Sequence, residues 1–117
     1  MSKFIVKDSG KRQEYKSGMV RDLQTGKPRY DLCYLPLLTD WAYLMAGGAE
    51  KYGENNWLHA DSLEEFNRFK ASAWRHFIQF MNGEMDEAHH AAVLFNLGAI
   101  MYLQKKLNID INGNKKE

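Results

Sequence analysis

The segment from Gly47 to Trp57, GGAEKYGENNW, gathers many side chains that could do chemistry. It supplies carboxylates, an ammonium group, a phenol, two adjacent amides and an indole directly after an apolar run. Gly53 suits the positive-φ residue that ends a helix, and the two asparagines that follow favour turns. The segment therefore predicts a helix whose end gathers polar groups into a ligand site. For single residues, a plain helix cap and loop, anchored to the core by Tyr52 and Trp57, is the alternative.

Acidic residues and histidines along the chain are candidates for binding a divalent cation. They are Glu50, Glu54, Glu84, Asp86, Glu87, His76, His89 and His90. Carboxylate oxygens with few thiols favour Mg²⁺ or Mn²⁺ over structural zinc. Such an ion would generate hydroxide from water and support hydrolysis of a phosphoanhydride. Acidic residues at helix starts are also ordinary caps, which is the alternative for Asp86 and Glu87.

Cationic and aromatic side chains could bind the rest of a nucleotide. The candidate phosphate ligands are Lys27, Arg29, Lys51 and Arg75. Pro28 stiffens the backbone between Lys27 and Arg29, so this pair is a potential phosphate clamp. A solvated loop in which Arg29 pairs with Asp31 is the alternative. Trp57 or Tyr52 could stack on a base.

The elements that must position these groups are mostly helical. Hydrophobic spacing and cap residues predict helices over Leu37–Tyr52, from Asp61 or Ser62 to about Asn82 before Gly83, and roughly over Asp86–Leu107. Two β-compatible pieces, Lys3–Lys7 and Gln13–Val20, flank the turn signal Asp8–Lys11 and predict a small hairpin or an ordered arm. We expect a mainly α protein, a small bundle of three main helices with an N-terminal arm or hairpin. Its parts would be an arm or hairpin with a basic loop over 1–30, a helical domain over 31–107 and a frayed polar tail over 108–117.

Two of the predicted helices carry more apolar surface than one small core can bury. The second has an apolar stripe formed by Leu63, Phe66, Phe69, Ala73, Phe77 and Phe80. Trp74 and Ile78 lie outside that stripe and suggest a subunit partner. In the third helix, 91–103 is apolar nearly all round except for Asn96, whose amide must find partners inside because an unpaired buried amide costs roughly 1–3 kcal/mol. We expect a homo-oligomer that completes the bundle.

Composition excludes several other classes of protein. The formal charge of +1 gives no electrostatic drive towards nucleic acid polymers or membranes. The single cysteine, Cys33, fits a reducing compartment, and no signal peptide or membrane span is visible, so we expect a cytoplasmic protein. Gly-rich nucleotide loops, paired Cys-x-x-Cys motifs and the Gly-x-Ser-x-Gly elbow are absent.

Four ordered motifs together carry a resemblance to a known family. They are RDLQTGKPRYDL, GAEKYGENNW, FKASAWRHFIQFMNGEMDE and HHAAVLFN, between about Arg21 and Tyr102. In this order and with short gaps they resemble the dATP/dGTP diphosphohydrolase domain family, small proteins common in bacteriophages. The resemblance implies a compact helical domain that splits a purine deoxynucleoside triphosphate into monophosphate and pyrophosphate with a divalent metal. In a phage-encoded protein this would take place in the host cytoplasm.

The resemblance also assigns roles to residues of this chain. The implied catalytic residues are Glu84, Asp86 and His89, and the implied Mg²⁺ or Mn²⁺ ligands are Glu50, Glu84, Asp86, Glu87 and His89, with His76 as a second ligand or as a residue that orients one. The implied substrate-binding residues are Lys27, Arg29, Lys51, Tyr52, Asn55, Trp57, Arg75 and Asn96. The rival hypothesis is a phage protein that sequesters a nucleotide, such as a cyclic signalling nucleotide, without hydrolysing it. A third is a structural oligomer whose polar cluster only stabilises helix ends.

Overall fold

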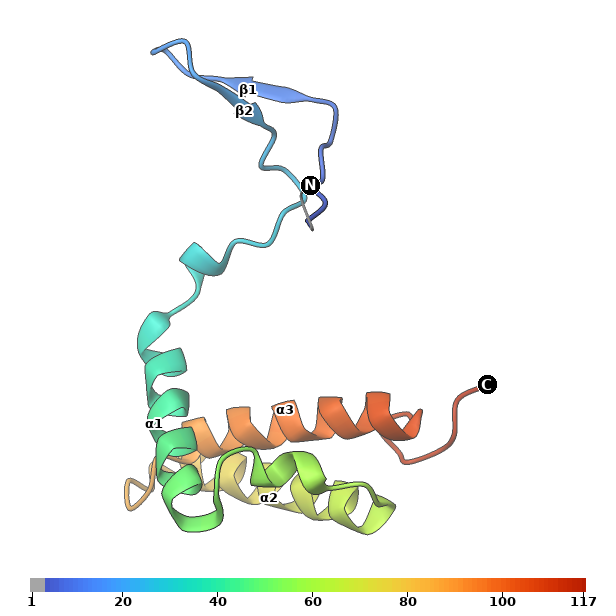
Figure 1. The fold of residues 1–117 in the computed structure, drawn as a ribbon. Coiled ribbons are helices and arrows are strands. Elements are labelled where there is room, and N and C mark those ends of the chain that lie inside the picture. The colour runs from blue at the N-terminus through green and yellow to red at the C-terminus, as the bar shows by residue number, and fades with distance from the viewer. Residues whose placement is uncertain (1–3) are drawn as a thin grey trace. The chain divides into compact units, whose positions relative to one another are not determined.

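The computed structural model describes residues 4–117 of the chain, which form two compact units, 4–33 and 34–117. The first unit holds the short strands β1 (Arg12–Glu14) and β2 (Val20–Asp22) and the 3-10 helix η1 (Tyr30–Leu32). The second holds α1 (Leu35–Tyr52), the 3-10 helix η2 (Asn56–His59), α2 (Leu63–Met81) and α3 (His89–Leu107) (Figure 1). The protein is thus mainly helical, as predicted.

The N-terminal hairpin exists, but its strands are not those predicted. β1 pairs antiparallel with β2, with Gln13 opposite Arg21. The segment Gln13–Val20, predicted as one strand, contains the turn instead, because Gly18 takes a φ of +92° there. Residues 4–7 form no strand, and Lys3 lies outside the described residues.

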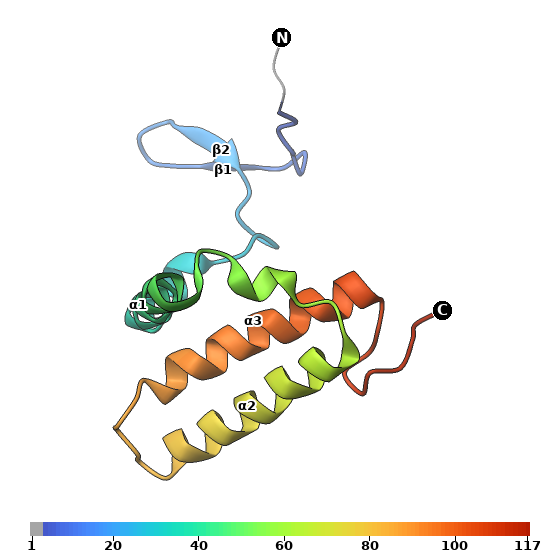
Figure 2. The same cartoon turned by 60° about the horizontal axis from the view of Figure 1, so that its bottom comes forward.

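The helical unit is built on the antiparallel pair α2 and α3, which lie side by side in both views (Figures 1 and 2). Phe66 of α2 and Leu103 of α3 are fully buried between them. Ser62 caps α2 by accepting a hydrogen bond from the Glu65 backbone N–H at 3.2 Å, as the sequence predicts. The Glu65 carboxylate in turn accepts a hydrogen bond from the Asp61 backbone N–H at 3.1 Å, so this helix start is fixed by local sequence.

Helix α1 packs across the N-terminal half of α3. The His90 ring of α3 lies 2.7 Å from an Asp40 carboxylate oxygen of α1, and Gly98 lies against Trp41. None of the residues of α1 is buried, although the helix is rich in leucine. It contacts its neighbour with one side only, and this leaves room for a pocket beneath its C-terminal end.

Three expectations about the helical unit are wrong. α3 begins at His89 rather than at Asp86, because residues 83–88 form a turn in which Gly83 has a φ of +78°. The tail is not frayed, since Ile109 is buried and the Lys116 N–H donates to the Asn108 carbonyl at 2.9 Å. Several members of the apolar stripe predicted for α2 are 43% to 49% exposed, namely Leu63, Phe77 and Phe80.

The face of α2 that points inward near its C-terminal end contains His76 instead, which is only 7% exposed. Trp74 and Ile78 are exposed, in keeping with their predicted position outside the apolar stripe. Within residues 4–117, no helix is both long and apolar enough to cross a lipid bilayer.

Candidate functional site

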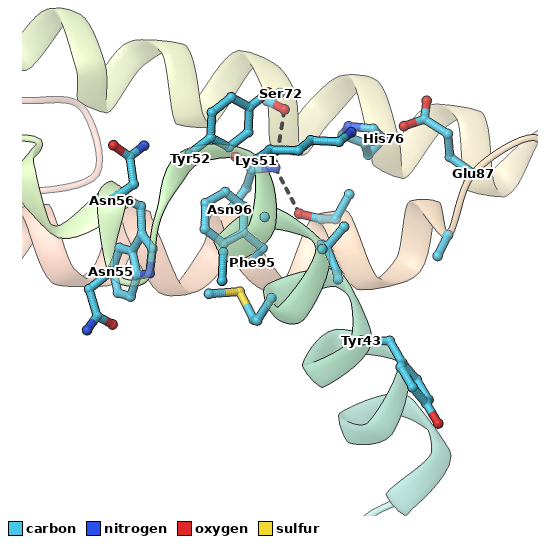
Figure 3. Close-up of a pocket in the computed structure, with 18 of the residues that line it drawn as sticks. Tyr43, Lys51, Tyr52, Asn55, Asn56, Ser72, His76, Glu87, Phe95 and Asn96 are labelled. Carbon is cyan, nitrogen blue, oxygen red and sulfur yellow. Dashed lines mark hydrogen bonds between the residues drawn. The ribbon is translucent and has the colours of Figure 1, made fainter.

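A pocket of about 480 Å³ opens in the helical unit where α1 ends (Figure 3). Its walls come from the C-terminal half of α1, the segment 53–57, the inner side of α2 and the first turns of α3. The side chains with polar atoms that line it are Tyr43, Lys51, Tyr52, Asn55, Asn56, Trp57, Ser72, His76, Glu87 and Asn96. A volume of this size is typical of small-molecule sites.

Local backbone conformation places the segment after α1 against this pocket. Gly53 ends the helix with a φ of +88°, and Asn55 takes the left-handed conformation before η2. Gly47 and Gly48 line the wall, and a Cβ at either position would meet no atom within 4 Å, so these glycines leave the wall open. The pocket therefore lies at the helix end where the sequence predicts a ligand site, beside Gly53 and two adjacent amides.

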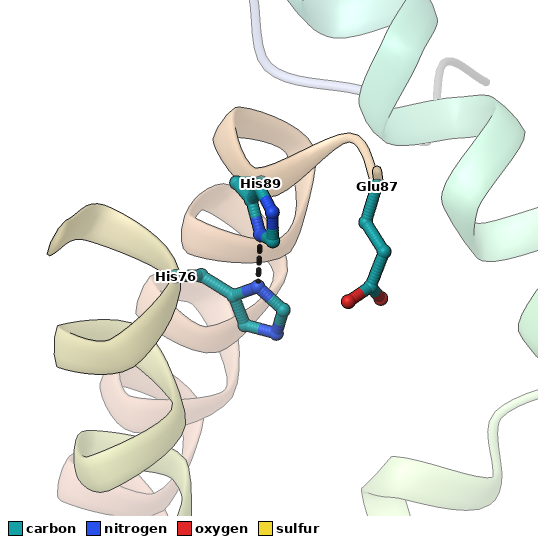
Figure 4. Close-up of side chains that lie close together, drawn as sticks. All are labelled: His76, Glu87 and His89. Atoms are coloured by element: carbon teal, nitrogen blue, oxygen red, sulfur yellow. Dashed lines mark hydrogen bonds between the residues drawn. The ribbon is translucent and has the colours of Figure 1, made fainter. Parts of the chain in front are cut away.

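At one end of the pocket, two histidines and a glutamate come together. His76 of α2, His89 of α3 and Glu87 of the preceding turn each offer one ligand atom, and these atoms lie within 4.8 Å of one another (Figure 4). The two imidazole Nδ1 atoms are 2.8 Å apart. His89 and His76 are 1% and 7% exposed, whereas Glu87 is exposed.

Asp86 fixes the orientation of His89. One of its carboxylate oxygens lies 2.8 Å from His89 Nε2, and this hydrogen bond lowers the pKa of Asp86. Because an ionised carboxylate only accepts, His89 Nε2 donates to Asp86, and the lone pair of His89 Nδ1 accepts the hydrogen bond from the Nδ1–H of His76. Burial, followed by the charge of Arg75, lowers the pKa of His76, so this ring is held in the neutral form that binds metals.

The chemistry of these donors fits a divalent cation. Two neutral imidazoles and a carboxylate suit Mn²⁺ and later transition ions better than Mg²⁺, which prefers oxygen ligands. A carboxylate that holds the second nitrogen of a ligating histidine, as Asp86 does for His89, is a recurrent feature of metal centres. The group His76, Glu87 and His89 could thus hold an ion, with Asp86 orienting the His89 ring.

The other end of the pocket is amide-rich and aromatic. In the view of Figure 3, Asn55 and Asn56 lie at the end of the pocket far from His76 and Glu87. The Trp57 ring packs edge-on against Phe95 and Tyr102, and its indole N–H is buried with no hydrogen-bond partner among residues 4–117.

Trp57 and Tyr52, the two residues predicted to stack on a base, differ in how accessible their rings are. The Trp57 ring belongs to a core cluster of aromatic side chains, whereas Tyr52 is 70% exposed at the pocket and has an accessible ring. Of the two, Tyr52 is the better placed to stack on a base.

Asn96 finds the internal partners that the sequence demands. Its amide nitrogen donates to the Ala92 carbonyl at 2.8 Å and to Ser72 Oγ at 3.2 Å. Both N–H groups are thus used within the protein, and the side-chain oxygen is what remains for a ligand. Asn96 ties α3 to α2 at the pocket wall.

The structure brings together some of the predicted site residues but not others. Those that line the pocket are Lys51, Tyr52, Asn55, Trp57, Glu87 and Asn96, while Asp86 and His89 belong to the adjoining carboxylate and histidine group. Glu84 contacts Gln79 at 3.4 Å and is not part of that group, and neither is Glu50. Arg75 is exposed, next to His76 in the chain, and is not among the pocket residues.

The predicted phosphate clamp belongs to the first unit, and its cations already have partners. Lys27 Nζ lies 2.9 Å from Asp22, and the Arg29 guanidinium donates two bonds to Asp31 at 2.9 and 2.8 Å. The alternative pairing of Arg29 with Asp31 is the one the structure contains.

Sequence reasoning undervalued His76 and missed Ser72 and Phe95 as pocket residues. One signal could have found them. In an antiparallel helical hairpin, residues at equal distances from the connecting turn lie opposite each other. With the turn centred near Gly83, His76 faces the start of α3, where His89 lies.

Comparison with known families places the chain. The family described as dATP/dGTP diphosphohydrolase, N-terminal, matches residues 17–111. The chain belongs to this family. The match includes the whole pocket and the His76, Glu87 and His89 group. The family is that of an N-terminal region, and its description names dATP and dGTP. Comparisons with curated proteins and with solved structures gave no match.

Proposed function

We propose that this protein hydrolyses purine deoxynucleoside triphosphates to the monophosphate and pyrophosphate with a divalent cation. The observation that carries the proposal is a single pocket with a His76, Glu87 and His89 group at one end and an amide and aromatic surface at the other. A nucleoside triphosphate has the same polarity, with anionic phosphates at one end and a flat, hydrogen-bonding base at the other. Membership of the dATP/dGTP diphosphohydrolase N-terminal family supports the same substrate class.

In the proposed reaction, water attacks the α-phosphorus while the bond between that phosphorus and the oxygen bridging to the β-phosphorus breaks. The leaving group is pyrophosphate, and the proton of the attacking water passes to solvent or to a basic side chain. A bound divalent cation would neutralise phosphate charge and lower the pKa of water. His76, Glu87 and His89 would hold it, and Asp86 would keep His89 oriented.

Lys51 is the residue of this chain best placed to bind phosphate. It lies in the last turn of α1 and lines the pocket. A lysine ammonium acts as a mobile point charge, which suits phosphates that change geometry during the reaction. Arg75 influences His76 electrostatically, so it adds positive potential near the same end of the pocket.

The base would occupy the other end. Tyr52 offers a ring for stacking, and the side-chain amides of Asn55 and Asn56 offer donors and acceptors to the edge of a purine. The Trp57 indole N–H, which is buried and has no partner in the described part of the chain, is a further donor at this end of the pocket.

The experiment is incubation of the purified chain with each deoxynucleoside triphosphate in Mn²⁺ or Mg²⁺, with products separated by chromatography. We expect dAMP or dGMP with pyrophosphate, faster with Mn²⁺ because the donors include two imidazoles. Glu87→Gln should abolish release, while Glu84→Gln, a matched change on the same turn outside the ligand group, should leave it within about twofold. Loss in both variants, or release of inorganic phosphate, would contradict the proposed site and reaction.

One observation favours nucleotide binding without turnover as the second candidate. Among residues 4–117, the ligand group contains a single carboxylate, Glu87, and hydrolysis of phosphoanhydrides commonly uses several. In that case the same assay would return intact nucleotide bound to the protein. Retention of unchanged dATP after denaturation and chromatography would decide for the binding protein.

A further inference from the structure

The outward face of α2 carries an apolar stripe that nothing in the helical unit covers. Trp74 is 66% exposed, Ile78 is 51% exposed and Met81 is 65% exposed, with exposed Ala71 one turn earlier. Trp74 precedes His76 by two residues, which places the two side chains on opposite sides of the helix. The stripe therefore points away from the pocket.

The spacing of the stripe identifies the kind of partner that fits it. Ala71, Trp74, Ile78 and Met81 follow one another at intervals of three, four and three residues. This is the repeat by which one helix packs along another at a small crossing angle. The partner is thus a helix that carries the same repeat, and α2 itself carries it.

We propose that α2 pairs antiparallel with α2 of a second copy of this chain about a two-fold axis. In such a pairing Trp74 of one copy lies opposite Ile78 of the other, and Ala71 lies opposite Met81. Each large side chain then meets a smaller one, and such alternation fills an interface without voids. Parallel pairing would instead set Trp74 against Trp74 and Ala71 against Ala71, which leaves one crowded and one empty layer.

The exposed area of the stripe and the net charge of the chain both favour a second copy of this chain as the partner. The exposed parts of the stripe and of neighbouring Phe77 amount to roughly 500 Å², more than half of the ~800 Å² per partner in a standard interface. Phe77 is 43% exposed and contacts the Trp74 ring edge-on at 6.5 Å between centroids. Two copies of a chain with a formal charge of +1 have almost no net repulsion to overcome.

The first test is the mass of the full chain in solution by sedimentation and by light scattering during gel filtration. We expect the wild type to have at least twice the mass of one chain. Ile78→Glu should halve the number of chains in each assembly and leave the circular dichroism spectrum unchanged. Ile111→Glu is the matched control, since Ile111 is 50% exposed in the C-terminal turn, and it should leave the mass unchanged. A monomeric wild type, or loss of mass in Ile111→Glu but not in Ile78→Glu, would overturn the proposal.

The second test fixes the orientation by disulfide cross-linking in a Cys33→Ser background. Antiparallel pairing brings Phe77 close to its own symmetry mate, so Phe77→Cys should form a covalent dimer on mild oxidation. Met81→Cys should not, because the residue opposite it is Ala71. Cross-linking through Met81→Cys alone would indicate parallel helices, and cross-linking through neither would refute the interface.

Discussion

Different interactions stabilise the two units of the chain internally. The helical unit buries apolar side chains, with Phe66 and Leu103 fully enclosed between α2 and α3. In the described part of the first unit, residues 4–33, no residue is buried. Its hairpin is held by polar contacts around Asp22, which accepts bonds from Ser9 and Lys27.

This difference explains where functional groups can be pre-positioned. In the helical unit, burial fixes His76 and His89 and lowers the pKa of His76. In the hairpin, charged groups bind one another at the surface, where an ion pair contributes about 0–1 kcal/mol. Lys27 and Arg29 of the first unit are therefore paired with aspartates at the surface, while Lys51 of the second unit lines the pocket.

The largest expected effect comes from the core. Phe66→Ala should lower the free energy of unfolding by about 3–5 kcal/mol, because it removes a fully enclosed ring between two helices. Urea denaturation followed by circular dichroism measures this. Tyr15→Ala, in the exposed hairpin turn, is the control and should change stability by less than about 0.5 kcal/mol. Equal losses would mean that the two units share one core.

The next effect separates two acidic residues that the sequence could not distinguish. Asp86→Asn should weaken Mn²⁺ binding by about 10- to 100-fold, because the carboxylate that orients His89 is lost. Glu84→Gln should leave the affinity unchanged, since Glu84 contacts Gln79 instead. Titration calorimetry gives both affinities. An equal loss of Mn²⁺ affinity in the two variants would show that Asp86 does not position His89 for metal binding.

The pH dependence of stability should also report on the buried histidine. The pKa of His76 is lower in the folded protein than its ordinary value of 6.5, so the unfolded chain binds more protons below that pH. Stability should be fully present above pH 6.5 and fall as the pH drops below it. Thermal melts from pH 7.5 to 5 should show this fall in the wild type and in His59→Gln, an exposed control, but less of it in His76→Gln.

The smallest effect is expected in the hairpin. The hydrogen bond from Ser9 and that from Lys27 lower the pKa of Asp22, so its contribution should be complete above pH 3.8 and be lost progressively as the pH falls below that value. Asp22→Asn should raise proteolytic cleavage within 4–33 severalfold and change the melting temperature of the helical unit by less than about 2 °C. A large drop in melting temperature would show that the hairpin supports the helical unit.

Local sequence signals were sufficient where one residue fixes a conformation. Pro36 marks the first turn of α1, Gly53 ends it, and Ser62 starts α2 through a side-chain bond to the backbone. These features depend on neighbours in the chain, so they can be predicted without tertiary structure.

The rest depends on partners far apart in sequence. The inward position of His76 is set by the packing of α2 on α3, since hydrophobicity alone favours Phe77 and Phe80. The grouping of His76 with Glu87 and His89 follows from the hairpin of α2 and α3, and Glu50 of α1 and Glu84 of the connecting turn lie outside this group. Composition and spacing supplied the candidate ligands but not their arrangement.

The most direct test of the proposed site is Mn²⁺ binding to the full chain, measured by the loss of the free-ion signal in electron paramagnetic resonance. We predict one tightly bound ion per chain, lost in His76→Gln and in Glu87→Gln and retained in Glu84→Gln. Absence of binding by the wild type, or binding that depends on Glu84 and not on His76, would contradict a metal centre at His76, Glu87 and His89.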